Sequence, residues 1–232
     1  MFTIRKGTDR GATRIDWLDS RHTFSFGDYN DPKFHQYRTL RVINDDRIAP
    51  GGGFGTHPHR DMEILTYVLA GAIEHRDSMG NGEVIHAGEW QAMHAGAGIL
   101  HSEFNPSQTE STHLLQIWIY PDRRGHVPGY QQKAFDGAGR NGAWQLAASP
   151  TGADGSLQVH QDVKLSVARL SAGQKVTYEL AEGRGAFLHV ATGAATVNGH
   201  TLVAGDAIAV DDESTLTVTG DRTGEVLLFD LA

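Results

Sequence analysis

The sequence of 232 residues contains no cysteine, and this absence removes several kinds of chemistry at once. Without a thiol there is no disulfide, no thiolate metal site and no cysteine nucleophile. Any bound metal ion must therefore be held by histidine, aspartate or glutamate. The composition is also compatible with a reducing compartment.

An excess of basic charge is absent as well. The chain has 20 Lys and Arg side chains against 28 Asp and Glu, which gives a formal charge of −8 with histidine counted neutral. A protein that binds nucleic acid directly needs basic side chains to displace counterions from the phosphates. We therefore expect no direct nucleic-acid binding, and the charge leaves a protein partner open.

Long hydrophobic runs are missing too. The first residues, MFTIRKGTDRGATRIDW, contain no apolar run that could form the core of a signal peptide, and no later segment approaches the length that crosses a bilayer. We expect a cytoplasmic protein that does not contact membranes. Two similar modules in one chain, described below, are compatible with a monomer.

Proline is scarce, with 7 residues, whereas glycine is abundant, with 28. The glycines separate short apolar or alternating segments, and no helical periodicity is sustained over a dozen residues. Short strands joined by many turns are typical of an all-β sandwich or barrel. The expected strand segments are 40–43, 64–69, 91–93, 114–120, 165–170, 186–190, 196–197, 207–210, 216–218 and 226–231.

An internal repeat refines this prediction. Residues 67–72 (YVLAGA) are echoed by residues 189–194 (HVATGA), and the segment 84–93 is echoed by 201–210, each with a glycine followed by an acidic residue in its middle. Two copies of one β module explain the pattern. We predict a first module at 1–135, a Gly-rich linker at 136–155 and a second module at 156–232.

Two of the 13 histidines stand in Thr56-His57-Pro58-His59, directly after a glycine-rich segment. Alternate side chains of an extended chain share a face, so His57 and His59 can bind one metal together. The same spacing recurs at His101 and Glu103, about 40 residues later. A single His-x-His is more often a surface pair, but two such pairs beside glycine turns favour a metal site.

Three histidines and one carboxylate form an N3O donor set that suits a divalent metal and leaves room for water, substrate or dioxygen. Glu63 is a rival carboxylate because it has the same strand parity as His59, although a bulge could turn it away. We rank Glu103 above Glu63. For the metal we expect iron first, with nickel, cobalt, manganese, copper or zinc as alternatives.

These motifs resemble those of the cupin superfamily. Gly51, five residues, His57-Pro-His59 and a later Gly71 are similar to the first cupin motif, and Gly88, His94, Gly96, His101 and Asn105 are similar to the second. The sequence departs from the cupin pattern where Ile64 replaces the expected glutamate and where two extra residues precede His101.

The departures are those of the pirin family, which takes its carboxylate from the His-x-Glu of the second motif. Further stretches that resemble pirins are WLDSRHTFSF at 17–26, YNDP at 29–32, LRVINDD at 40–46 and LQIW at 115–118. The likeness extends from about residue 2 to the C-terminus, and it is closest to bacterial pirin-like proteins described as quercetin dioxygenases.

The resemblance implies an all-β bicupin, with two similar antiparallel β-barrel or jelly-roll modules facing each other. It implies one metal ion in the first module, held by His57, His59, His101 and Glu103, and no metal in the second module. It also implies an enzyme of flavonoid metabolism, which opens the heterocyclic ring of a flavonol such as quercetin with O2 and releases carbon monoxide.

In this mechanism Glu103 is both a ligand and the base that receives the hydroxyl proton. A carboxylate bound tightly to a cation is a poor base, so its bond to the metal would have to be weak or through one oxygen. Two other classes of function stay open. One is a metal-dependent regulatory module, as pirins of higher organisms are cofactors of transcription regulators. The other is a metal-dependent isomerase or hydrolase, because one fold serves many reactions.

Several other residues have a lower rank. His22, Phe24 and Phe26 could line the pocket or belong to the core, and His94 and His113 could orient a metal ligand or lie at a strand edge. His160 is expected to be structural.

Overall fold

The computed structural model describes all residues 1–232, and its regular elements are β-strands with three short 3-10 segments. The expected strand segments all fall on strands, and only Tyr120 lies just beyond the end of its strand. The all-β prediction is confirmed. The chain has no helix with the length and apolar character needed to cross a bilayer.

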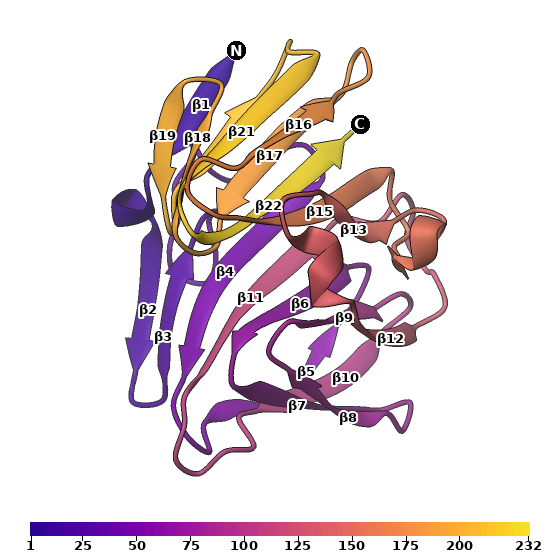
Figure 1. Cartoon of the computed structure of the whole chain (residues 1–232). Helices are drawn as coiled ribbons and strands as arrows, with labels where there is room; N and C mark the ends of the chain where they lie inside the picture. Colours follow the sequence, from indigo (N-terminus) through magenta and orange to yellow (C-terminus); the bar gives the residue numbers. More distant parts are fainter. The chain divides into compact units, whose positions relative to one another are not determined.

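The chain divides into two units. Unit 2 comprises residues 11–135 and 159–161, and unit 1 comprises residues 1–10, 136–158 and 162–232. The first ten residues thus belong with the C-terminal half, because β1 (Phe2–Arg5) pairs antiparallel with β20 (Ala207–Val210). Figure 1 shows the indigo β1 beside the orange and yellow strands of its unit.

Unit 2 contains a seven-stranded and a four-stranded sheet. The larger sheet has the order β12-β9-β6-β11-β4-β3-β2, and the smaller sheet has the order β5-β10-β7-β8. The strands are β2 (Gly11–Ile15), β3 (Leu18–His22), β4 (Leu40–Ile48), β5 (Gly53–His59), β6 (Glu63–Ala70), β7 (Ala72–Asp77), β8 (Gly82–His86), β9 (Glu89–His94), β10 (Ile99–Phe104), β11 (Thr112–Ile119) and β12 (Gly129–Ala134).

Unit 1 repeats this arrangement. Its larger sheet has the order β1-β20-β17-β22-β15-β13-β14, and its smaller sheet has the order β16-β21-β18-β19. The remaining elements are η1 (Gly7–Asp9), η2 (Gly137–Arg140), β13 (Gln145–Ser149), η3 (Ala153–Gly155), β14 (Leu157–Gln158), β15 (Val163–Leu170), β16 (Lys175–Glu179), β17 (Gly185–Val190), β18 (Ala194–Val197), β19 (His200–Val203), β21 (Thr215–Arg222) and β22 (Gly224–Leu231). The segment predicted as a linker thus forms β13 and two 3-10 turns.

The sequence repeat coincides with equivalent turns in the two units. Gly71 and Gly193 follow the central strands β6 and β17 and have φ values of +74° and +75°. Gly88 and Gly205 precede β9 and β20 and have φ values of +87° and +89°. Glycine adopts this left-handed conformation at little cost, so the repeat preserves the residues that the turns require.

The two units fill their interiors differently. In unit 1, 16 buried apolar residues form one cluster that includes Val176 of β16 and Leu216 and Val218 of β21. In unit 2 the apolar residues form smaller clusters, one around Ile48, Val68 and Leu114 and another around Ile64 and Met93. Polar side chains occupy part of the interior of unit 2, and the candidate site lies there.

The turn at Gly193 generates a prediction about stability. A Cβ at Gly193 would lie 2.5 Å from the carbonyl oxygen of Thr223, whereas a Cβ at Gly183, where φ is +80°, would meet nothing within 4 Å. Both alanine substitutions carry the left-handed backbone penalty of roughly 1–2 kcal/mol, and Gly193→Ala adds a steric clash of about 1–3 kcal/mol. Chemical denaturation should show the larger loss for Gly193→Ala. Equal losses would contradict the role of the close approach.

Candidate metal centre and cavity

Three of the four predicted ligands converge in unit 2. His57 and His59 lie on β5 and His101 lies opposite them on β10, with His101 paired to His57 in the register of the two strands. One ligand atom from each histidine lies within 4.8 Å of the others. The i, i+2 spacing therefore has the expected consequence, because alternate side chains of β5 share one face.

The hydrogen bonds of His57 and His101 assign their tautomers. His57 Nδ1 lies 2.8 Å from the carbonyl oxygen of Gly55, which can only accept, so Nδ1 carries the proton. The Nε2 atom of neutral His57 then has a free lone pair. It lies 3.1 Å from His101 Nε2.

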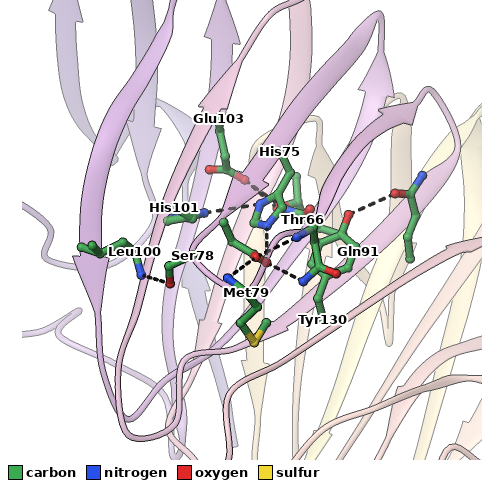
Figure 2. Close-up of polar contacts among 12 residues, drawn as sticks. Thr66, His75, Ser78, Met79, Gln91, Leu100, His101, Glu103 and Tyr130 are labelled. Carbon is green, nitrogen blue, oxygen red and sulfur yellow. Dashed lines mark hydrogen bonds and ion pairs between the residues drawn. The ribbon is translucent and has the colours of Figure 1, made fainter.

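His101 is oriented by a second histidine, His75 of β7. The Nδ1 atoms of His101 and His75 are 3.5 Å apart, and His75 Nε2 lies 3.1 Å from Asp77 Oδ2. Burial alone would raise the pKa of Asp77, but hydrogen bonds from Asn81, His75 and backbone N–H groups lower it, so Asp77 is ionised and accepts the His75 proton. With its proton on Nε2, His75 offers Nδ1 as an acceptor for the Nδ1 proton of His101. Figure 2 shows His75, His101 and Glu103 gathered in one place.

These tautomers leave two imidazole lone pairs facing each other across 3.1 Å. Such an arrangement is repulsive unless a metal ion or a proton lies between the nitrogens. Burial and repulsion by neighbouring histidines also lower the pKa of His59 to about 4 and that of His101 to about 3. Both rings are uncharged near neutral pH, and uncharged imidazole is the form that binds metals. The donor set of this site fits a divalent metal.

Glu103 lies next to the histidines but outside their triad. It forms a second group of close ligand atoms with His101 and His75. The register of β10 against β5 shifts between His101 and Glu103, so a bulge separates the two residues. The assignment of Glu103 as a metal ligand and as the base stays a prediction.

The Glu103 carboxylate is held by amide donors on both oxygens. Gln91 Nε2 donates to Oε1 at 2.9 Å, and Gln116 Nε2 donates to Oε2 at 2.8 Å. The Thr66 hydroxyl links the two amides, since it accepts from Gln91 at 2.8 Å and donates to Gln116 at 2.9 Å. Thr66, Gln91 and Gln116 are neighbours on β6, β9 and β11. One polar row across three strands therefore fixes the orientation of Glu103.

A cavity of about 510 Å³ opens beside the triad in unit 2, a volume within the range of small-molecule sites. His57, His59 and Glu103 line it. Its aromatic walls come from Trp17 and Phe54, whose rings meet edge to face at 4.9 Å, and from Phe26 and Trp118, whose rings do so at 5.4 Å. Its polar wall comes from β3 and β4 and contains Ser20, His22, Asn44 and Asp46.

The remaining candidates from the sequence lie elsewhere. Glu63 pairs with His94 at 2.6 Å and with His160 at 3.2 Å. His113 pairs with Asp45 at 2.7 Å. Among the N-terminal candidates, His22 and Phe26 line the cavity, and Phe24 is buried.

Sequence reasoning missed His75, and of the cavity walls it named only His22 and Phe26. A usable signal existed in His75-Arg76-Asp77, a third pair of ligand-type residues at i, i+2 spacing. The polar row was not recognisable, because Thr66, Gln91 and Gln116 come from separate segments and each is an unremarkable strand residue.

Comparison with known proteins places the chain in a family. Residues 4–119 match the pirin family, and residues 146–231 match the family described as quercetinase C-terminal cupin domain. The chain is 50% identical over 231 residues to quercetin 2,3-dioxygenase of Escherichia coli K12, with 100% of this chain and 99% of that protein covered. It is 41% identical to a pirin-like protein of Caulobacter vibrioides, with 98% and 99% covered.

Comparison with solved structures gives the same family. The crystal structure of YhhW from Escherichia coli has a TM-score of 0.97 at 50% identity, covering 100% of this chain and 98% of that chain. The structure of the bacterial pirin YhhW in complex with nickel(II) has a TM-score of 0.95 at 49% identity, with 100% and 99% covered. The chain belongs to the pirin family, and its fold is a bicupin.

The role of His75 generates a prediction. His75→Phe keeps the bulk of the buried ring but removes the acceptor that orients His101, so we expect metal affinity to fall about 10–100-fold. His113→Phe, which removes a histidine paired with Asp45 instead, should leave metal affinity unchanged. Competition with a chelator of known affinity measures both. Equal affinities for the two folded variants would show that His75 does not act on the site.

Proposed function

We propose that this protein is a metal-dependent dioxygenase that opens the heterocyclic ring of flavonols such as quercetin with O2 and releases carbon monoxide. The observation that carries the proposal is the convergence of His57, His59 and His101 at a cavity with aromatic sides, where the Nε2 atoms of His57 and His101 lie 3.1 Å apart. The names of the relatives agree with this activity.

His57, His59 and His101 would hold the metal, and Glu103 would complete the donor set. A divalent metal supplies a Lewis acid that lowers the pKa of a bound hydroxyl, and a redox-active metal also supplies a partner for O2. Nitrogen and oxygen donors accept several metals, so iron is our first expectation and nickel, cobalt, manganese, copper and zinc are alternatives.

The cavity walls suit a flat, partly apolar substrate. Two pairs of aromatic rings line the cavity. One pair is Trp17 with Phe54, and the other is Phe26 with Trp118. Aromatic rings pack favourably against each other in offset or edge-to-face geometry. A flavonol would be held by these walls with its 3-hydroxyl toward the histidines, and the surrounding side chains would exclude water.

Glu103 would accept the proton of the 3-hydroxyl. Its two oxygens already accept hydrogen bonds from Gln91 and Gln116, which keep the carboxylate oriented toward the cavity. The reaction adds O2 and loses CO, so the proton that Glu103 accepts must pass to the ring-opened product or to solvent before the next turnover.

The activity is tested by incubating metal-loaded protein with quercetin, with and without oxygen, while following the flavonol absorbance. We expect a loss of absorbance that requires oxygen, stops after addition of a chelator and accompanies release of carbon monoxide. No loss with any of the metals named above would reject the enzyme and favour a regulatory binding module. Turnover without oxygen consumption would point instead to an isomerase or hydrolase.

The assignment of Glu103 is tested by Glu103→Gln. This change keeps the size of the side chain and removes the proton acceptor, so turnover should fall about 10²–10⁴-fold, while metal content falls much less. Glu63→Gln is the matched control at the rival carboxylate, and it should leave the metal content of the folded protein unchanged. Full turnover of Glu103→Gln would refute the base assignment.

A further inference from the structure

The polar wall of the cavity contains a buried carboxyl group that the proposed reaction does not use. Asp46 lies on β4 beside Ser20 of β3, and it lines the cavity together with the triad residues His57 and His59. Its exposed fraction is 3%. Its neighbour Asp45 points to the other face of β4, where His113 and Arg47 bind it.

Asp46 Oδ1 is the one fully buried carboxyl oxygen of this chain without a hydrogen-bond partner. Three other carboxyl groups buried in unit 2 have partners on both oxygens. Glu63 accepts from His94 and His160, Asp77 accepts from His75 and from the Asn81 side chain and backbone, and Glu103 accepts from Gln91 and Gln116. Asp46 has only the Ser20 hydroxyl as a side-chain donor.

An unpaired polar atom in the interior is costly, so its retention requires an explanation. Trp118 also lines this cavity, and its buried Nε1 atom likewise lacks a partner. A carboxyl acceptor and an indole donor without partners, both in residues that line one cavity, point to a polar ligand that completes their hydrogen bonds.

We propose that Asp46 forms a binding subsite for a second phenolic hydroxyl group of the substrate, separate from the hydroxyl that lies at the histidine triad. This inference rests on the proposed function, and it narrows the substrate class to polyhydroxylated flavonols. Asp46 is a specificity-determining residue in this view and takes no part in proton transfer.

A phenolic hydroxyl suits this position better than other polar groups. Burial, together with repulsion by Asp45 and Glu103, raises the pKa of Asp46 to about 7 against the opposing effect of Ser20, so both forms of the carboxyl are accessible near neutral pH. A hydroxyl donates to the ionised form and accepts from the protonated form. An anionic group would be repelled by the ionised form, and an ether oxygen would pair only with the protonated form.

The test compares two flavonols without oxygen, so that binding is measured apart from turnover. The probes are quercetin, which has hydroxyls on both outer rings, and 3-hydroxyflavone, which has only the hydroxyl that the triad would take. Each is titrated into nickel-loaded protein, and the readout is the ratio of the Kd of 3-hydroxyflavone to the Kd of quercetin.

In Asp46→Leu we expect the ratio to fall about tenfold or more relative to the wild type, because a buried hydrogen bond to the substrate is lost. In Asp46→Asn the ratio should fall by less, since an amide still pairs with a hydroxyl. Asp45→Asn is the matched control, because Asp45 is the neighbouring carboxyl group on the opposite face of β4 and does not line the cavity, and its ratio should equal that of the wild type.

The outcomes separate the two proposals. If the wild type binds both flavonols and both Asp46 variants keep its ratio, the subsite is refuted and the proposed activity stands. If the wild type binds neither flavonol, the proposed function fails and the subsite fails with it. Should Asp46→Leu not fold, Asp46→Ala takes its place because it also removes the acceptor, and an unchanged ratio again refutes the subsite.

Discussion

The site depends on two imidazole lone pairs that face each other across 3.1 Å, at Nε2 of His57 and of His101. The surrounding structure maintains this unfavourable contact. The carbonyl oxygen of Gly55 accepts the Nδ1 proton of His57. His75, oriented by Asp77, accepts the Nδ1 proton of His101. Burial lowers the pKa of His59 and His101 and keeps these two rings uncharged near neutral pH, so their nitrogens can bind a cation. The polar row of Thr66, Gln91 and Gln116 holds Glu103 beside these histidines.

The internal duplication clarifies why one unit carries such a site. The order β9-β6-β11-β4 in the larger sheet of unit 2 matches β20-β17-β22-β15 in unit 1, and the smaller sheets match throughout, so β5 and β10 correspond to β16 and β21. The former pair carries the histidines, whereas the latter pair directs Val176, Leu216 and Val218 into a continuous apolar cluster. Filling the interior with apolar side chains maximises burial. Unit 2 instead has a cavity and a polar row in its interior, and it stabilises them with hydrogen bonds.

The parts of the site that could be predicted are those governed by strand geometry. His57 and His59 had to share a face once they were on one strand, and glycine turns indicated that the strands were short. The side of β10 on which Glu103 falls could not be predicted in the same way, because the register shifts between His101 and Glu103. The His75-x-Asp77 pattern marks His75 as a candidate, but it does not reveal which ligand His75 contacts. Its relation to His101 depends on the pairing of β7 with β10, which no local pattern in the sequence specifies.

The sequence by itself determined the class of fold, the duplication and the residues able to bind a metal, because these depend on local periodicity, turn glycines and the chemistry of side chains. The tertiary structure alone decided which carboxylates meet which donors. Glu63 and Glu103 are alike in sequence terms, yet Glu63 pairs with His94 and His160 while Glu103 lies at the cavity beside the triad. Asp45 and Asp46 are adjacent and chemically identical, yet they face opposite sides of β4. Long-range strand pairing sets these environments, and it arises from the packing of the whole unit.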